Sequence, residues 1–152
     1  LKQIQFKSGF DVVLCIDAAY HSNLNSFLDS VESVLNSKGR LGFHYLMLSE
    51  QWLNLNSLQK KKYQWLLKAA DVNLDNLMTE SALKHTLQTY DFEDIEIRDL
   101  SEAVLQGFAN YFQQLPQQTT DLDAFKIRMT AKLCRKLYVD GLVKYVQISA
   151  RK

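Results

Sequence analysis

The chain has 152 residues, of which 47% are hydrophobic and 23% charged, and this is the composition of one ordinary globular domain. These fractions exclude a disordered chain, a collagen-like fibre and a low-complexity chain. A formal net charge of +1 gives no electrostatic signature of binding to nucleic acid or to an anionic membrane, so we expect neither partner.

The first predicted element is a strand over residues 10–16. Its short, β-branched and continuous apolar core is typical of a strand that is buried on both faces. A polar break over 17–23 precedes a predicted helix over 24–35, in which apolar residues recur at helical spacing. Ser22 or Asn23 is the expected N-cap of this helix.

Residues 36–40 should end the helix, with Gly39 in a left-handed turn. A second buried strand is predicted over 41–48. The order strand, helix, strand within about forty residues is typical of a βαβ unit with a right-handed crossover.

The rest of the chain is less regular. It predicts helices over 57–70 and 81–90, a half-exposed strand over 94–100, a helix capped by Ser101, a loop at Pro116, a long helix from Asp121, a tight turn at Asp140–Gly141 and a last strand over 142–149. The last two strands suggest an antiparallel edge pair. The run Lys60–Lys62 is interpreted as a solvated helix face, with an anion or lipid contact as the alternative.

Two features bear on the setting of the protein. Cys15 and Cys134 are far apart and form no disulfide or zinc pattern, which predicts buried thiols in a reducing compartment, the cytoplasm. No apolar run reaches the roughly 18 residues of a membrane helix. The chain begins at Leu1 rather than Met and soon enters a strand, so we expect it to be part of a longer domain.

Chemistry-bearing side chains gather where the first strand ends. Asp17, Tyr20 and His21 lie within five residues, at the edge where open α/β sheets bind ligands. An aspartate there can orient a histidine, and a histidine that titrates near neutral pH can accept a proton from a substrate. The alternative is that Asp17 and His21 only cap the helix that follows.

The other histidines carry weaker signals. His44 lies within the second strand and is interpreted as a core residue rather than a catalyst, and His85 has no partner at metal-ligand spacing. The sequence therefore predicts no metal site. It also contains no Gly-x-Gly phosphate loop, no Walker motif and no nucleophile elbow.

The segment from Phe10 to His21, the helix after it and the run Ser37 to Leu41 together resemble the second half of a class I S-adenosylmethionine-dependent methyltransferase. In that family a Phe-Asp pair begins an apolar strand, and the strand ends in an acidic residue that is followed four residues later by a histidine. The stretches Asp91–Ile97 and Gly141–Lys152 are similar to the family's sixth and seventh strands. The usual glycine pair is reduced here to Lys38–Gly39, and Asp91 replaces a usual glycine.

The resemblance implies an α/β fold: the carboxyl half of a Rossmann-like methyltransferase sheet, comprising strands four to seven with an antiparallel last strand and helical insertions. Residues 1–152 would then form a single partial domain. The family's first strand, glycine loop and ribose-binding acid have no counterpart in this sequence. The resemblance implies S-adenosylmethionine as cofactor, approached by Cys15 and Ile16.

The Asp17 to His21 spacing is also similar to the acid-x-x-x-His motif of phosphoethanolamine and sterol methyltransferases. That resemblance implies His21 as general base and Asp17 as its orienting partner. It places Tyr20 beside the acceptor pocket and Tyr45 at a substrate-facing position. The implied reaction is methyl transfer to a small-molecule or lipid-like acceptor.

Two other functions stay open: a catalytically inactive, methyltransferase-like binding subunit, and a plain α/β interaction domain. The family's first strand lies beside its fourth, so residues 11–16 would form an open apolar edge without it. Such an edge favours aggregation or dimerisation. We therefore expect poor solubility of the chain alone or pairing through this edge.

Overall fold

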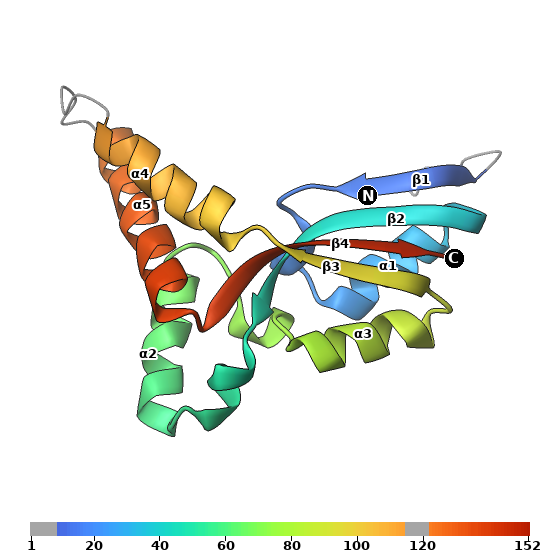
Figure 1. The fold of residues 1–152 in the computed structure, drawn as a ribbon, viewed down its shortest axis with the longest axis horizontal. Coiled ribbons are helices and arrows are strands. Elements are labelled where there is room, and N and C mark those ends of the chain that lie inside the picture. The colour runs from blue at the N-terminus through green and yellow to red at the C-terminus, as the bar shows by residue number, and fades with distance from the viewer. Residues whose placement is uncertain (1–8, 115–121) are drawn as a thin grey trace.

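The computed structural model describes residues 9–114 and 122–152 (Figure 1). A four-stranded sheet and its helices form in the order β1 (Phe10–Cys15), α1 (Leu24–Glu32), β2 (Leu35–Leu48), α2 (Ser57–Lys68), α3 (Glu80–Thr89), β3 (Glu93–Asp99), α4 (Gly107–Gln114), α5 (Leu122–Asp140) and β4 (Val143–Arg151). Short 3-10 turns η1 (Ala19–His21), η2 (Glu50–Asn54) and η3 (Leu74–Asn76) and the π-helical turn η4 (Glu102–Gln106) join them. The loop predicted at Pro116 and the helix start predicted at Asp121 lie outside the described residues.

The strand order is β1-β2-β4-β3. Strand β1 pairs parallel with β2, as the predicted βαβ unit requires, and β4 runs antiparallel to both β2 and β3. The predicted antiparallel pair is therefore confirmed, with β3 as the outer strand. Strand β1 is the other edge of the described sheet, as the resemblance implied.

One face of the sheet, the covered face, packs against α1 and α3. Side chains from alternate positions of β2 and β4 meet those of the two helices in one core, which includes Phe43, Tyr45, Leu28, Leu83 and Ile148. Each of these five is at most 1% exposed. Burying a side chain of this size contributes about 1.5–3 kcal/mol, so this core contributes strongly to the stability of the sheet.

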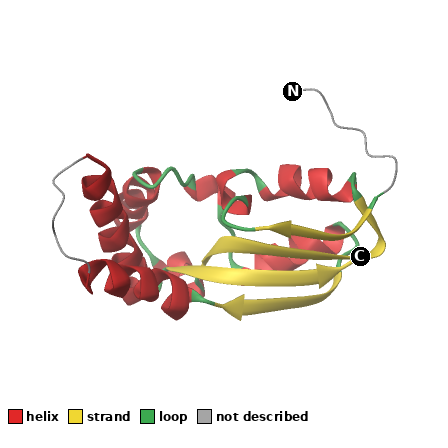
Figure 2. Cartoon of the chain, turned by 90° about the horizontal axis from the view of Figure 1, so that it is seen from above, coloured by secondary structure: helices red, strands yellow, loops and turns green. Residues whose placement is uncertain are grey.

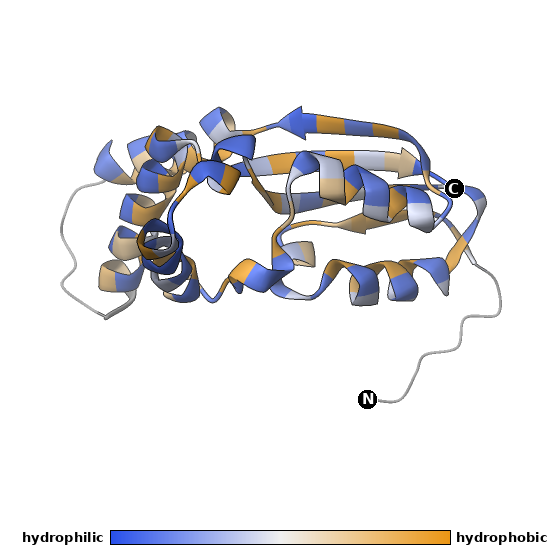
Figure 3. Cartoon of the chain, turned by 90° about the horizontal axis from the view of Figure 1, so that it is seen from below, coloured by the Kyte–Doolittle hydropathy of each residue, from blue (hydrophilic) through white to orange (hydrophobic). Residues whose placement is uncertain are grey.

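Figures 1 and 2 show α2, α4 and α5 gathered at one end of the sheet, whereas α1 and α3 run along it. A second core forms at that end from Leu46, Leu48, Val143 and residues of α2, η4 and α5. Figure 3 shows hydrophobic and hydrophilic residues alternating along the strands, because neighbouring side chains point to opposite faces. The second core therefore takes up only part of the face opposite α1 and α3.

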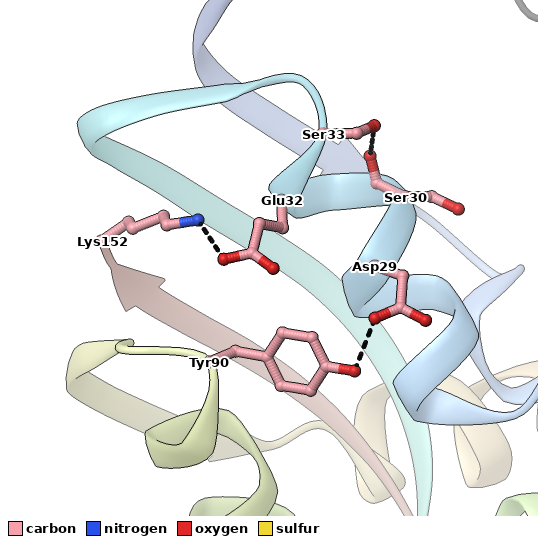
Figure 4. Close-up of polar contacts among 6 residues, drawn as sticks. All are labelled: Asp29, Ser30, Glu32, Ser33, Tyr90 and Lys152. Atoms are coloured by element: carbon pink, nitrogen blue, oxygen red, sulfur yellow. Dashed lines mark hydrogen bonds and ion pairs between the residues drawn. The ribbon is translucent and has the colours of Figure 1, made fainter.

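Polar contacts attach α1 to its surroundings (Figure 4). The Tyr90 hydroxyl, just after α3, donates to Asp29 at 2.8 Å. Lys152, at the carboxyl end, pairs with Glu32 at 2.9 Å. These partly exposed contacts fix the position of α1 more than they add to stability, because exposed ion pairs contribute about 0–1 kcal/mol.

Local structure departs from the prediction at two turns. Strand β2 begins at Leu35, six residues earlier than predicted, and Lys38 rather than Gly39 has the left-handed backbone, with a φ of 67°. Gly39 is needed for space instead, since a Cβ there would lie 2.6 Å from Leu35 Cδ1 and 2.7 Å from the Asn36 carbonyl oxygen. A tight turn was predicted at Asp140–Gly141, and Gly141 there has a left-handed backbone with a φ of 62°.

Caps are confirmed in one case and corrected in another. Asn23 caps α1, its side chain accepting from the Asn25 backbone N–H at 2.9 Å. Neither Asp17 nor His21 has this role. Ser101 was predicted to cap a helix, but its hydroxyl makes no cap contact and instead accepts from the Tyr145 backbone N–H at 3.0 Å.

The prediction that both faces of β1 are buried is wrong for one face. Val13 and Cys15 pack on the core with α1 and α3, but Val12, Leu14 and Ile16 are 53%, 71% and 66% exposed. The physical reason is that α1 and α3 cover only one side of the strand, and no other described residue covers these three. We call the side of the sheet that carries Leu14, Gly42 and His44 the open face.

Candidate active site at the end of strand β1

The chain leaves β1 through a strained residue. Asp17 has a left-handed backbone with a φ of 56°, which aspartate tolerates better than most residues. The turn η1, which contains Tyr20 and His21, follows close after the carboxyl end of β1 and contacts β2. The side chains singled out in the sequence thus lie at the edge where α/β sheets bind ligands.

Asp17 belongs to a network that joins three elements. Its carboxylate accepts the hydroxyl hydrogen of Tyr145, in β4, and the same phenol oxygen lies 2.6 Å from Nδ1 of His44, in β2. His44 Nδ1 is 3.9 Å from Asp17 Oδ1. Burial, then the hydrogen bond to Asp17, raises the pKa of Tyr145, so the phenol stays protonated at neutral pH.

His21 lies elsewhere in the site. Its Nδ1 is 3.0 Å from the backbone carbonyl oxygen of Asp71, and its ring lies against that of Tyr20, with centroids 4.5 Å apart. It lines a cavity of about 550 Å³ together with Gln64, Lys68 and Asn73. The structure thus gives Asp17 and His21 separate hydrogen-bond partners, whereas the sequence analysis paired them.

The two predicted tyrosines differ in environment. Tyr20 is half-buried between the two cores, and burial followed by the nearby Asp17 charge raises its pKa. Tyr45 is fully buried on the covered face, where its hydroxyl donates to the Asn76 carbonyl, and burial raises its pKa. A substrate contact by Tyr45 stays a prediction, and its hydroxyl has a structural partner here.

The predicted cofactor-approaching residues lie on opposite sides of β1. Cys15 is half-buried toward the covered face, and burial, partly offset by backbone N–H groups of Ala18 and Ala19, raises the pKa of its thiol. Ile16 is exposed beside the open face. Both cysteines are free thiols, and both are part-buried, whereas buried thiols were predicted.

Other sequence candidates take no part in this site. His85 is exposed on α3, and Lys61 and Lys62 are exposed on α2, as expected of a solvated face. Within residues 9–114 and 122–152, no group of histidine, cysteine and carboxylate side chains is arranged to hold a metal ion. In the same ranges, no helix is long and apolar enough to cross a membrane.

Sequence reasoning missed Tyr145 and set His44 aside as a core residue. The two are diagonal neighbours on one face, because His44 pairs with Gln147 and Leu46 pairs with Tyr145. The signal that could have found them is the antiparallel pairing of β2 with β4. That pairing brings a histidine and a tyrosine far apart in sequence onto the face that adjoins Asp17.

Comparison with known proteins adds the wider context. No known protein family and no curated protein matches the chain by sequence. Solved structures do match its fold. A cyclopropane synthase from Mycobacterium tuberculosis has a TM-score of 0.73 and 15% identity, and the match covers 97% of this chain and 57% of that one.

Two further solved structures also match the fold of this chain. A phosphoethanolamine N-methyltransferase from Haemonchus contortus, solved with phosphomonomethylethanolamine and S-adenosylhomocysteine, has a TM-score of 0.76 and 13% identity, covering 97% of this chain and 35% of that one. A geranyl diphosphate C-methyltransferase from Streptomyces coelicolor has a TM-score of 0.67 and 13% identity, covering 97% and 50%.

The chain thus spans between about a third and three fifths of these similar structures. Its sheet has one parallel pair, and its last strand, β4, is antiparallel, as the resemblance implied. The chain therefore has the fold of the carboxyl-terminal half of the Rossmann-like, class I S-adenosylmethionine-dependent methyltransferases.

Proposed function

We propose that the protein is the acceptor-side part of an S-adenosylmethionine-dependent methyltransferase that acts on a small-molecule or lipid-like acceptor. The observation that carries this proposal is the gathering of Asp17, Tyr20, His21, His44 and Tyr145 at the carboxyl ends of the parallel strands of this fold. Ligands of open α/β sheets bind at that edge.

The residues present suit one end of the proposed cofactor. The exposed Ile16 side chain and the Asp17 carboxylate, whose side chain is 58% exposed, offer an apolar contact and a negative charge to a sulfonium group. We propose that the family's first strand and glycine loop are supplied by residues outside this sequence. The open face of β1 and the partial coverage of similar structures support this.

When bound, S-adenosylmethionine supplies an electrophilic methyl group. Most of the rate of such a displacement comes from positioning, which contributes up to about 7–11 kcal/mol in well-oriented systems. A base is needed only where the acceptor must lose a proton. We propose His21 for this task, because a carbonyl can only accept, so Nδ1 donates to Asp71 and Nε2 of the neutral ring keeps its lone pair.

An apolar groove favours a lipid-like acceptor or an acceptor with a hydrocarbon part. Between α2 and α5 lies a cavity of about 570 Å³ with mainly apolar lining, which includes Leu66, Ala70, Phe125, Met129 and Leu133. Phe125 and Met129 are 60% and 49% exposed. Apolar ligand sites of this size commonly accept small organic molecules.

We also propose a cellular compartment and a mode of self-association for the protein. Free thiols at Cys15 and Cys134 suit the reducing cytoplasm. The open edge and exposed apolar residues of β1 support pairing of the isolated chain with a second copy through this strand. A longer form that carries the family's first strand would cover the same edge and remain unpaired.

The test of the proposed function is His21→Ala in a form of the protein that binds S-adenosylmethionine. We expect turnover with a proton-bearing acceptor to fall by about 10²–10⁴, the usual contribution of a general base, while cofactor affinity changes little. Unchanged turnover would leave His21 with a structural role only. A protein that binds the cofactor but methylates nothing would support the inactive binding subunit instead.

A further inference from the structure

The carboxylate predicted to serve His21 is connected to a different histidine. The Tyr145 hydroxyl donates its only hydrogen to the Asp17 carboxylate, which can only accept when ionised. The phenol oxygen can therefore only accept from its second neighbour, Nδ1 of His44, at 2.6 Å. Nδ1 of His44 thus carries a hydrogen, and in the neutral ring the lone pair lies on Nε2.

The middle member of this relay is held firmly. Tyr145 is 5% exposed, its backbone N–H donates to the Ser101 hydroxyl at 3.0 Å, and its carbonyl accepts from the Leu100 N–H at 2.9 Å. Its ring meets the His44 ring edge-on, with centroids 5.3 Å apart. The backbone bonds fix the position of Tyr145 in β4, and burial packs its ring against His44.

The far end of the relay faces outward. The His44 side chain is 23% exposed and lies on the open face, as does the 71% exposed Leu14. Among residues 9–114 and 122–152, Nε2 of His44 has no hydrogen-bond partner, whereas Nδ1 has the phenol. A lone pair with a fixed direction is thereby presented to whatever binds at this place.

We propose that His44 is a second proton acceptor of this site, and that Asp17 and Tyr145 are its positioning residues. The reaction assigned to it rests on the proposed function. The acceptor's X–H bond gives its proton to His44 Nε2 and its electron pair to the new X–C bond, while the electrons of the broken S–C bond stay on sulfur. The imidazolium that forms is stabilised by the Asp17 charge through Tyr145.

His44 has an advantage that His21 lacks. Nδ1 of His21 is hydrogen-bonded to a neutral backbone carbonyl, whereas Nδ1 of His44 lies 3.9 Å from the Asp17 carboxylate oxygen Oδ1. A carboxylate at this distance attracts the positive charge that develops on an imidazole ring as it takes up a proton or reacts with an electrophile. His44 therefore has a charged partner through Tyr145, whereas His21 has only a neutral one.

The first experiment maps acylation of each histidine by diethyl pyrocarbonate, using mass spectrometry. Asp17→Asn keeps the acceptor for the Tyr145 hydroxyl and suits the left-handed backbone, but removes the charge. We expect acylation of His44 to slow about twofold or more, while His21 and the exposed His85 react as before. Slowing of His21 instead of His44 would overturn the proposal.

The second experiment reads the tautomer of His44 from long-range ¹H–¹⁵N NMR spectra of the neutral ring. We expect the Nδ1–H form in the native protein and a shift toward the Nε2–H form in Tyr145→Phe. Tyr90→Phe, which also removes a phenol that donates to a carboxylate, is the matched control and should leave His44 unchanged. An Nε2–H form in the native protein would refute the relay.

Neither readout needs the cofactor, so failure of the proposed function would leave both results valid. The link to catalysis is tested by His44→Asn, whose amide can still donate to Tyr145 but which lacks Nε2. If His44 accepts a proton, this variant keeps its thermal stability and loses turnover at least tenfold wherever the native protein has methyltransferase activity. Full activity with intact stability would reduce the network to a structural contact.

Discussion

Replacing Leu14 with threonine should weaken self-association of the 152-residue chain. Leu14 is 71% exposed on the open face of edge strand β1. Burying a leucine fully contributes about 2 kcal/mol, so covering this one would contribute about 1.4 kcal/mol per copy. In a symmetric pair the substitution counts twice, which predicts a dissociation constant about 100-fold higher.

The assay is sedimentation velocity over a concentration series. Leu58→Thr is the matched control, because Leu58 is 79% exposed but lies on α2, away from the edge. It should leave association unchanged, and threonine preserves the strand propensity of β1 at position 14. A native chain that stays monomeric at every concentration, or a control that weakens association as much as Leu14→Thr, would refute the reasoning.

Three further predictions concern stability, measured by urea denaturation. Gly39→Ala should destabilise the fold by about 1–3 kcal/mol, because the new Cβ would meet Leu35 and the Asn36 carbonyl. Gly107→Ala, whose Cβ would have no neighbour nearer than 3.7 Å, should stabilise the fold by about 0.5–1 kcal/mol, because alanine favours a helix more than glycine does. Equal effects of the two variants would contradict the crowding at Gly39. Tyr45→Phe should cost about 1–2 kcal/mol by leaving the Asn76 carbonyl unpaired, and no loss would mean that water replaces the hydroxyl. Burial alone would raise the pKa of Asp99, but hydrogen bonds from Ser101 and Lys144 lower it overall. The ionised Asp99 therefore stabilises the folded state above the unfolded-state pKa near 3.8, and this stabilisation is lost as pH falls through the folded-state pKa. Asp99→Asn should abolish this loss.

Much of the fold could be predicted because its elements are amphipathic. The helices over α1, α2 and α3 follow from apolar spacing, and the N-cap Asn23 from its side-chain chemistry. The irregular start of β2 could not be predicted. Lys38 adopts a left-handed backbone there although Gly39 stands beside it, because packing against Leu35 assigns the glycine to a crowded position.

The candidate site was located in the sequence but its partnerships were not. Asp17, Tyr20 and His21 were found because they follow a strand end directly. The connection of Asp17 to Tyr145 spans 128 residues and depends on the register between β2 and β4. Local spacing holds no information on that register, so the sequence favoured the nearest histidine as the partner.

The same limit applies to burial of β1. A continuous apolar run is the pattern of a strand covered on both faces. Here α1 and α3 cover one face, and Val12, Leu14 and Ile16 remain exposed on the other. The apolar run of β1 is thus typical of a strand in a sheet with both faces covered. We therefore propose that a segment outside this sequence covers its exposed face.

The most direct test of the central claim is the melting temperature of the protein with and without S-adenosylmethionine. A ligand at 100 times its dissociation constant stabilises the folded state by about 2.7 kcal/mol, which is readily detected. We predict little or no shift for the 152 residues alone and a clear shift for a form extended at its amino end by a strand and a glycine-rich loop. A strong shift for the short chain would contradict the partial-domain account, and none for the extended form would contradict the methyltransferase assignment.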